Sequence, residues 1–210
     1  MKALAICGSP RKNGNTEYYL RLYLAELAAK GLETEFLWLG DKHILPCRGC
    51  YGCLTYKACV QKDDFEDIFA RMEAADAIII GSPVYVSKPS ALLTALLERV
   101  TFSARASGRM LSGKVGAPVT VARRAGQTFA FAELLLWYFI NDMVIPGSMY
   151  WNVGVAGAKG AIDADRDLEG IEIIKYAAAN TAKVMLALQA TAADAPVDRD
   201  KLFFTPPAGK

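Results

Sequence analysis

Short apolar runs alternate along this chain with segments in which apolar residues recur at helical spacing. The runs at residues 3–7, 35–39, 77–80, 115–122 and 150–155 predict five strands, and the segments at 16–30, 65–74, 90–100, 127–143 and 167–188 predict five helices. The strand runs are continuously apolar, which is typical of strands that helices cover on both faces. The sequence therefore predicts an α/β fold, a three-layer, doubly wound arrangement around a five-stranded parallel sheet.

The expected strand order is 2-1-3-4-5. In this order the chain reverses its direction of progress between the first and third strands, and ligands bind in the crevice beyond the carboxyl ends of those strands. We expect one domain over residues 1–190, with a cysteine loop at 47–59, and a loosely held C-terminal tail at 191–210. The loops after the first, third and fourth strands are therefore the candidate ligand-binding segments.

Composition narrows the classes of partner. The chain has 210 residues, 53% of them hydrophobic, and a formal net charge of +2 without a run of basic residues longer than a pair. Its most apolar segment, residues 129–140, contains Glu133 and is shorter than the roughly 20 residues that a bilayer span needs. The first residues lack a signal segment. We expect a cytoplasmic protein that binds neither nucleic acid nor membrane.

The loop after the first predicted strand has the composition of an anion site. It leads directly into a helix, whose N-terminal N–H groups and dipole favour a phosphate. The spacing of its glycines differs from Walker A and from G-x-G-x-x-G, so the expected ligand is a monophosphate group. The alternative is an ordinary turn with Asn15 as the helix cap. The candidate phosphate-binding residues are Ser9, Arg11, Asn13, Gly14, Asn15 and Thr16.

The loop after the third strand, residues 81–87, offers an aromatic side chain and exposed backbone amides. A flat isoalloxazine ring needs apolar or aromatic surface on its faces and backbone partners along its edge. Tyr85 is the candidate for stacking on that ring, with core or interface packing as the alternative for its side chain. The candidate ring-binding residues are Pro83, Val84, Tyr85 and Val86.

The loop after the fourth strand carries paired arginines. Arg123 and Arg124, followed by Gly126, could face the pyrimidine edge of a flavin or receive the phosphate of a nicotinamide cofactor. The alternative is a solvated arginine pair. Cys7, at the end of the first strand, is interpreted as a small buried core residue. No side chain is expected to act as an acid, base or nucleophile.

Four cysteines lie within thirteen residues, spaced C-x2-C-x2-C-x5-C. They are Cys47, Cys50, Cys53 and Cys59. So compact a run favours convergence of the thiolates on an iron-sulfur cluster. Zinc is the second interpretation, because structural zinc sites usually combine two separated C-x2-C pairs. A disulfide framework is the third, and a redox-sensitive patch without a metal stays open.

These segments together resemble one known group. GSPRKNGNT resembles the FMN phosphate loop of the NADPH-dependent FMN reductase group of flavodoxin-like proteins, and GSPVY resembles its isoalloxazine loop. The compact cysteine run, followed by Asp63 and Asp64, is similar to the cluster-binding segment of the iron-sulfur flavoproteins within that group. The resemblance implies a flavodoxin-like domain, non-covalently held FMN, a 4Fe-4S cluster on the four cysteines, and assembly as a homodimer or homotetramer.

Three functions follow as hypotheses. The first is a flavoprotein that transfers electrons between a 4Fe-4S cluster and FMN, with a ferredoxin-like protein as a candidate electron donor. NADPH is a candidate reductant of the flavin. The second is an NAD(P)H-dependent FMN or quinone reductase in which the cysteine loop is structural. The third is a non-enzymatic, flavin-dependent binding partner that docks through residues 129–140, a segment that core packing and a homodimer interface explain better.

Overall fold

A computed structural model, which describes residues 1–190, contains a parallel sheet of five strands within those residues. The strands lie in the order β2-β1-β3-β4-β5, as predicted. Their bounds are β1 Lys2–Cys7, β2 Glu33–Trp38, β3 Ala77–Pro83, β4 Val115–Ala122 and β5 Val153–Val155. The tail predicted at 191–210 lies outside the described residues.

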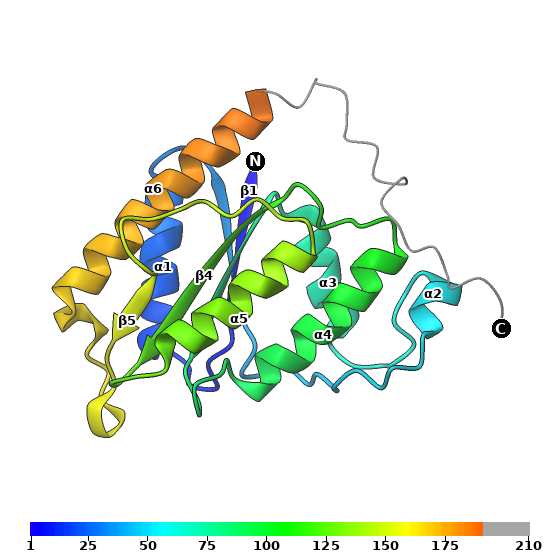
Figure 1. Cartoon of the computed structure of the whole chain (residues 1–210), viewed down its shortest axis with the longest axis horizontal. Helices are drawn as coiled ribbons and strands as arrows, with labels where there is room; N and C mark the ends of the chain where they lie inside the picture. Colours follow the sequence, from blue (N-terminus) through cyan, green and yellow to red (C-terminus); the bar gives the residue numbers. More distant parts are fainter. Residues whose placement is uncertain (191–210) are drawn as a thin grey trace.

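Helices cover both faces of the sheet (Figure 1). On one face α1 (Asn15–Ala28) packs against α6 (Leu168–Ala190), and on the other lie α3 (Phe65–Ala74), α4 (Ala91–Ala106) and α5 (Gln127–Ile140). Alternate residues of β1 enter the two cores, so that Ala3, Ala5 and Cys7 face the first layer and Leu4 and Ile6 the second. The three-layer fold predicted from the continuous apolar runs is confirmed.

Several element boundaries differ from the predicted ones. The fourth predicted helix ends at Ile140 rather than 143, and the helix that Ser90 caps continues to Ala106 rather than 100. The fifth strand covers only 153–155, because it pairs with just three residues of β4 at the sheet edge. Ser90 caps this helix, because its side chain accepts a hydrogen bond from the backbone N–H of Leu93.

Short elements complete the described chain. The cysteine loop contains a helical turn that the sequence did not indicate, α2 (Gly52–Tyr56), and two 3-10 turns, η1 (Ala158–Gly160) and η2 (Ala164–Arg166), follow β5. Over residues 1–190 the structure contains no helix with the length and apolar character of a membrane span.

One close contact joins α5 to the centre of the sheet. The buried hydroxyl of Tyr138 accepts a hydrogen bond from the backbone N–H of Ile80 at 3.1 Å and donates to the carbonyl of Ala117 at 3.0 Å. The ring lies so close to β4 that a Cβ at Gly116 would approach a ring carbon to 2.4 Å. Glycine at this position is therefore what allows α5 to pack at its observed height.

We predict that Gly116→Ala destabilises the fold by about 1–3 kcal/mol, because the new methyl group must displace the Tyr138 ring in a packed core. Urea unfolding of the variant measures this loss. Gly147→Ala is the matched control, since no heavy atom lies within 4 Å of the position its Cβ would take. Equal stability of the two variants would contradict the packing argument.

Candidate cofactor sites

A cavity of about 210 Å³ lies beyond the carboxyl ends of β1, β3 and β4, at the predicted switch point. We call it the switch-point cavity. It brings together nine residues predicted from the sequence and six that were not. The predicted ones are Ser9, Arg11, Gly14, Asn15, Thr16, Pro83, Val84, Tyr85 and Arg123, and the others are Val121, Ala122, Ala156, Gly157, Gly160 and Ile162.

The first wall of the cavity is the N-terminus of α1. Gly14 occupies the cap position and no side chain caps the helix there, so its first N–H groups remain open to a ligand. Ser9 is buried, and its hydroxyl accepts the backbone N–H of Arg11 at 3.2 Å. Asn13 lies outside the lining, because its backbone N–H turns to the buried Glu17 carboxylate at 2.8 Å. This wall can receive an anion.

Asn15 has a structural partner that the sequence did not reveal. Its side-chain amide donates to the Ala161 carbonyl at 2.9 Å, and its side-chain oxygen accepts the N–H groups of Asp163 at 2.9 Å and Ala164 at 3.1 Å. These bonds fix residues 157–164 against the start of α1. The segment after β5 thereby forms the third side of the cavity. The glycines of this segment were the signal in the sequence that could have indicated a binding loop.

The second wall is a tight turn after β3. The backbones of Tyr85 and Lys88 exchange two hydrogen bonds, at 2.9 and 3.0 Å, and the central residues Val86 and Ser87 both have positive φ. A β-branched residue rarely adopts that conformation, and such outliers cluster at ligand sites. Val86 is 97% exposed and lies outside the lining, whereas the half-exposed Tyr85 borders the cavity.

Only one of the two arginines after β4 borders the cavity. Arg123 lines the cavity, whereas Arg124 and Gly126 do not. Gly126 instead supports the turn of the second wall, because a Cβ there would lie 2.9 Å from the Ser87 hydroxyl and 3.1 Å from the Val84 side chain. Its φ of +91° is also unfavourable for other residues.

The cysteines form a second, separate site. Cys47, Cys50, Cys53 and Cys59 are free thiols, and all four line one small cavity of about 20 Å³, which we call the cysteine cavity. Burial raises the pKa of the Cys53 thiol, and the neighbouring Cys59 and Cys47 add to the shift. Within residues 1–190 no three His, Cys, Asp or Glu side chains are gathered tightly enough to hold a metal ion. The four thiols together are a donor set that suits a sulfur-ligated group.

Cys7 plays no part in this site. It is buried in the core of the first layer, and burial raises the pKa of its thiol to about 12. Such a thiol is a poor nucleophile, since the thiolate is the reactive form. The prediction that Cys7 is a core residue is confirmed.

A buried arginine of α4 connects the cysteine loop to the core. Arg99, 1% exposed, pairs with the buried Asp63 carboxylate at 2.5 Å and donates to the Leu45 carbonyl at 3.1 Å. Its other terminal nitrogen lies 3.2 Å from the Cys59 sulfur, and its guanidinium stacks 4.2 Å from the Phe65 ring centre. The role of Arg99 was not predicted from the sequence. The signal that could have indicated it is a charged residue at an otherwise apolar position of the helix.

Asp63 closes the base of the loop from the other side. Its carboxylate accepts the N–H of Leu45 at 2.8 Å and of Phe65 at 3.2 Å. Burial opposes ionisation of this carboxyl, but the hydrogen bonds from Arg99 and the backbone outweigh burial and lower its pKa. Arg99 and the two backbone N–H groups thus hold the Asp63 carboxylate in its ionised form. Asp64 occupies the cap position of α3.

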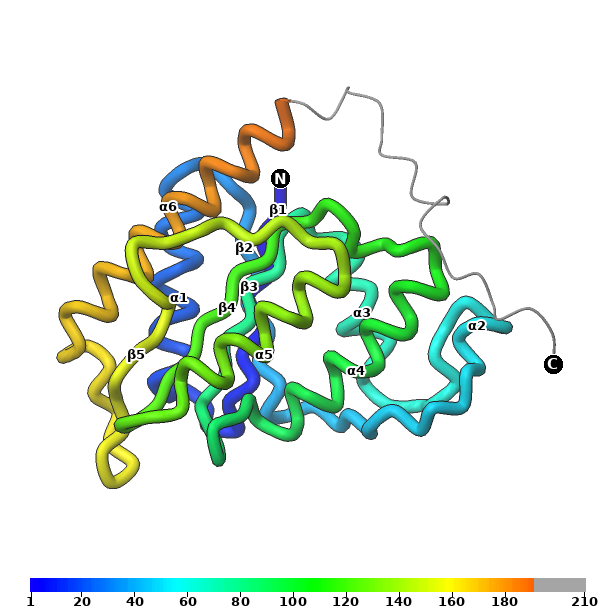
Figure 2. The backbone as a smooth tube through the Cα atoms, in the orientation of Figure 1, coloured from blue at the N-terminus to red at the C-terminus, as the bar shows by residue number. Residues whose placement is uncertain are grey.

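The two sites lie apart within the chain. The switch-point cavity and the cysteine cavity share no lining residue. Figure 2 shows the cysteine loop, in cyan, at one end of the long axis and the loop after β5, in yellow, near the other. Each site can therefore hold its own group.

Known proteins share both the sequence and the fold. Residues 1–158 match the family of NADPH-dependent FMN reductases. An iron-sulfur flavoprotein of Methanocaldococcus jannaschii is 36% identical over 192 residues, which cover 88% of this chain and 97% of that protein. An iron-sulfur flavoprotein of Methanosarcina thermophila is 30% identical, over 90% of this chain and 97% of its own length.

Solved structures agree on the fold. RosB with the bound intermediate 8-demethyl-8-formylriboflavin-5′-phosphate superposes with a TM-score of 0.71 at 17% identity, covering 100% of this chain and 95% of that one. A WrbA-like flavodoxin of Agrobacterium tumefaciens gives a TM-score of 0.60 at 18% identity, covering 89% and 98% of the two chains. The fold and the position of its cavity define a flavodoxin-like protein.

The chain belongs to the NADPH-dependent FMN reductase family, within its iron-sulfur flavoprotein subgroup. It is a flavin-dependent oxidoreductase. The resemblance that the three motifs indicated is confirmed.

We predict that Arg99→Met lowers the free energy of unfolding by about 3–5 kcal/mol, because it leaves the Asp63 carboxylate buried without its partner. Urea unfolding of the FMN-loaded protein measures the change. Arg105→Met, at an exposed position of the same helix, should cost less than about 0.5 kcal/mol. Equal losses of unfolding free energy in the two variants would show that the buried ion pair stabilises the fold no more than an exposed arginine does.

Proposed function

We propose that this protein binds FMN in the switch-point cavity and a 4Fe-4S cluster on the cysteine loop, and that it transfers electrons between them. The observation that carries the cluster is the joint lining of one cavity by Cys47, Cys50, Cys53 and Cys59. The names of the related iron-sulfur flavoproteins support the same assignment. The cluster supplies one-electron steps, and the flavin supplies one- or two-electron steps.

The chain's own residues would hold FMN at two points. The open N–H groups at the start of α1, with the Ser9 and Thr16 hydroxyls beside them, suit the phosphate. Tyr85 and Ile162 border the cavity with aromatic and aliphatic surface, which suits a flat ring. Arg123 adds a positive charge at the rim, where it would favour the anionic form of a reduced ring.

On the cluster side the chain supplies thiolates and a fixed cation. The N–H group that Arg99 directs at the Cys59 sulfur would stabilise negative charge on that ligand. Hydrogen bonds to ligand sulfurs are among the terms that set a cluster's potential. The pairing of Arg99 with Asp63 keeps the guanidinium in place for this contact.

The second candidate function is an NAD(P)H-dependent FMN or quinone reductase without a cluster. One observation favours it, because residues 1–158 match the family of NADPH-dependent FMN reductases. In the first function we propose a ferredoxin-like protein as the electron donor, and in the second NADPH as the reductant. A cytoplasmic location stays a prediction.

Replacement of Cys50 by Ser separates the two functions. We predict that Cys50→Ser loses most of the iron and acid-labile sulfide and retains one FMN per chain, because the two cavities share no residue. Iron, sulfide and flavin assays of anaerobically purified protein measure this. Cys7→Ala, a change of a cysteine outside the loop, should keep all three. Full iron content in Cys50→Ser would refute ligation by that residue.

We also propose that the protein is a homodimer or homotetramer. The face of α5 that points away from the sheet exposes Phe129 (72%), Leu136 (69%), Phe139 (78%) and Ile140 (53%). The opposite face, with Leu134 and Tyr138, is buried in the core. An apolar face of this kind on a helix suits self-association, and the interpretation of residues 129–140 as part core and part interface is consistent with it.

We predict that Phe139→Glu shifts the protein to a smaller species, because a carboxylate cannot be buried unpaired at a self-association interface. Light scattering coupled to size exclusion gives the molar mass. Lys30→Glu, an exposed charge change at the end of α1, should keep the wild-type mass. A monomeric wild-type protein, or an unchanged mass for Phe139→Glu, would overturn the interface.

A further inference from the structure

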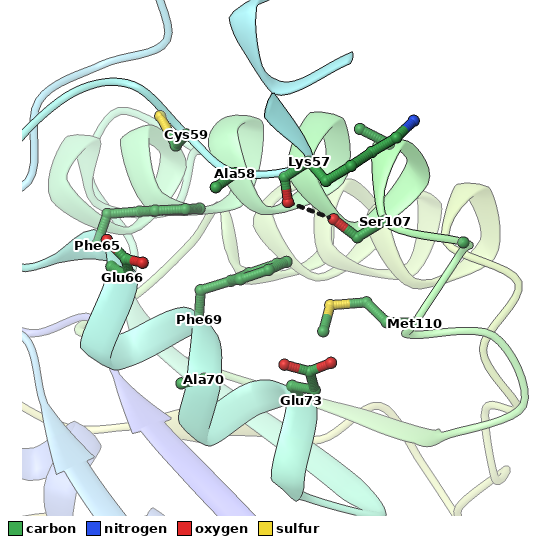
Figure 3. A pocket seen from close by; sticks show the side chains of 12 residues that line it. Lys57, Ala58, Cys59, Phe65, Glu66, Phe69, Ala70, Glu73, Ser107 and Met110 are labelled. Atoms are coloured by element: carbon green, nitrogen blue, oxygen red, sulfur yellow. Dashed lines mark hydrogen bonds between the residues drawn. The ribbon is translucent and has the colours of Figure 1, made fainter. Parts of the chain in front are cut away.

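A third cavity, of about 630 Å³, lies between α3, the end of the cysteine loop and the end of α4. We call it the α3 cavity. It contains none of the residues of the switch-point cavity and shares only Cys59 with the cysteine cavity. Figure 3 shows its walls. They include Phe65, Glu66, Phe69, Glu73, Ser107 and Met110.

The walls are apolar and partly aromatic. Phe65 and Phe69 stack with ring centres 5.3 Å apart and planes 17° from parallel. The Met110 side chain faces the Phe69 ring across the cavity (Figure 3). A hydrogen bond of 2.9 Å from the Ser107 hydroxyl to the Lys57 carbonyl ties the cysteine loop to the end of α4 above them. A flat apolar group can lie between the aromatic wall and the thioether.

Two carboxylates, Glu66 and Glu73, line these walls together with one cation, Lys57. A further cation, Arg99, stacks on the Phe65 ring, but its charge is paired with the Asp63 carboxylate. In Figure 3 the Glu73 carboxylate lies next to the end of the Met110 side chain, and Glu66, which also lines the cavity, is two turns of α3 or about 10 Å away. The ammonium of Lys57 points away from the cavity in the same view. Lys114, which is near Glu73, is outside the lining and donates to the Glu73 carbonyl at 2.7 Å.

We propose that the α3 cavity binds a small organic cation with a flat aromatic body. An aromatic face attracts a cation. The two carboxylates that line the α3 cavity, both on α3, strengthen that attraction. The same carboxylates disfavour anions, so the site is unsuited to nucleotides and carboxylic acids. The ligand would lie beside Cys59 and away from the switch-point cavity. This inference stands independently of the proposed cluster, since none of its contacts needs one.

Calorimetric titration of the FMN-loaded protein at pH 8 tests the proposal. The probe is 1-methyl-4-phenylpyridinium, and 4-phenylpyridine, which is uncharged at that pH, is its matched neutral compound. We expect one saturable site for the cation and at least fivefold weaker binding of the neutral compound, as loss of a cation–π and charge contact of about 1 kcal/mol requires.

Two variants locate the site. Glu73→Gln and Glu66→Gln remove exposed carboxylates, and we expect Glu73→Gln to weaken binding of the cation about fivefold or more and Glu66→Gln to weaken it as well. Glu169→Gln, an exposed change in the first turn of α6, should leave the affinity unchanged. Absence of saturable binding, equal affinity for the neutral compound, release of FMN by the cation, or insensitivity to Glu73→Gln would each overturn the proposal.

Discussion

The buried ion pair between Arg99 and Asp63 is the contact on which the cysteine loop depends. One partner, Arg99, comes from α4, and the other, Asp63, lies just before the start of α3. Between them they bind the backbone at Leu45 and the sulfur of Cys59, near the two ends of the loop. A pair removed from water is tolerated only when its hydrogen bonds are satisfied, and here the backbone and a thiol complete most of them. The loop is thus anchored at its base while its cysteines stay accessible.

The switch-point cavity depends on a different principle, the topology of the sheet. Parallel strands in the order β2-β1-β3-β4-β5 bring the ends of β1, β3 and β4 to one edge, and the loops that follow them meet there. Backbone N–H groups at the start of α1 and the turn at Tyr85 are products of local sequence. Asn15 then joins this local structure to residues 157–164 through three hydrogen bonds. The result is a site made by the scaffold, separate from the anchored cysteine loop.

The difference between local and long-range constraints explains what the sequence could predict. Strands and helices follow from periodicity within ten or so residues, and the order of the sheet follows from a small set of allowed topologies. The phosphate loop and the cysteine run are also local motifs. Arg99 and the segment after β5 are not, because Arg99 meets Cys59 and Asp63 across 40 and 36 residues, and Asn15 meets Asp163 across 148. Four residues that were predicted to bind a cofactor do not line the cavity, namely Asn13, Val86, Arg124 and Gly126. Gly126 instead shapes the adjoining turn through its lack of a side chain.

The central claim is that one chain holds a flavin and an iron-sulfur cluster at two distinct sites. The most direct measurement is the content of iron and acid-labile sulfide per FMN in wild-type protein purified anaerobically. The account predicts about four of each per flavin, as a cuboidal cluster on four thiolates requires. FMN at full occupancy without iron or sulfide, even after reconstitution, would contradict it and would favour the reductase that works without a cluster.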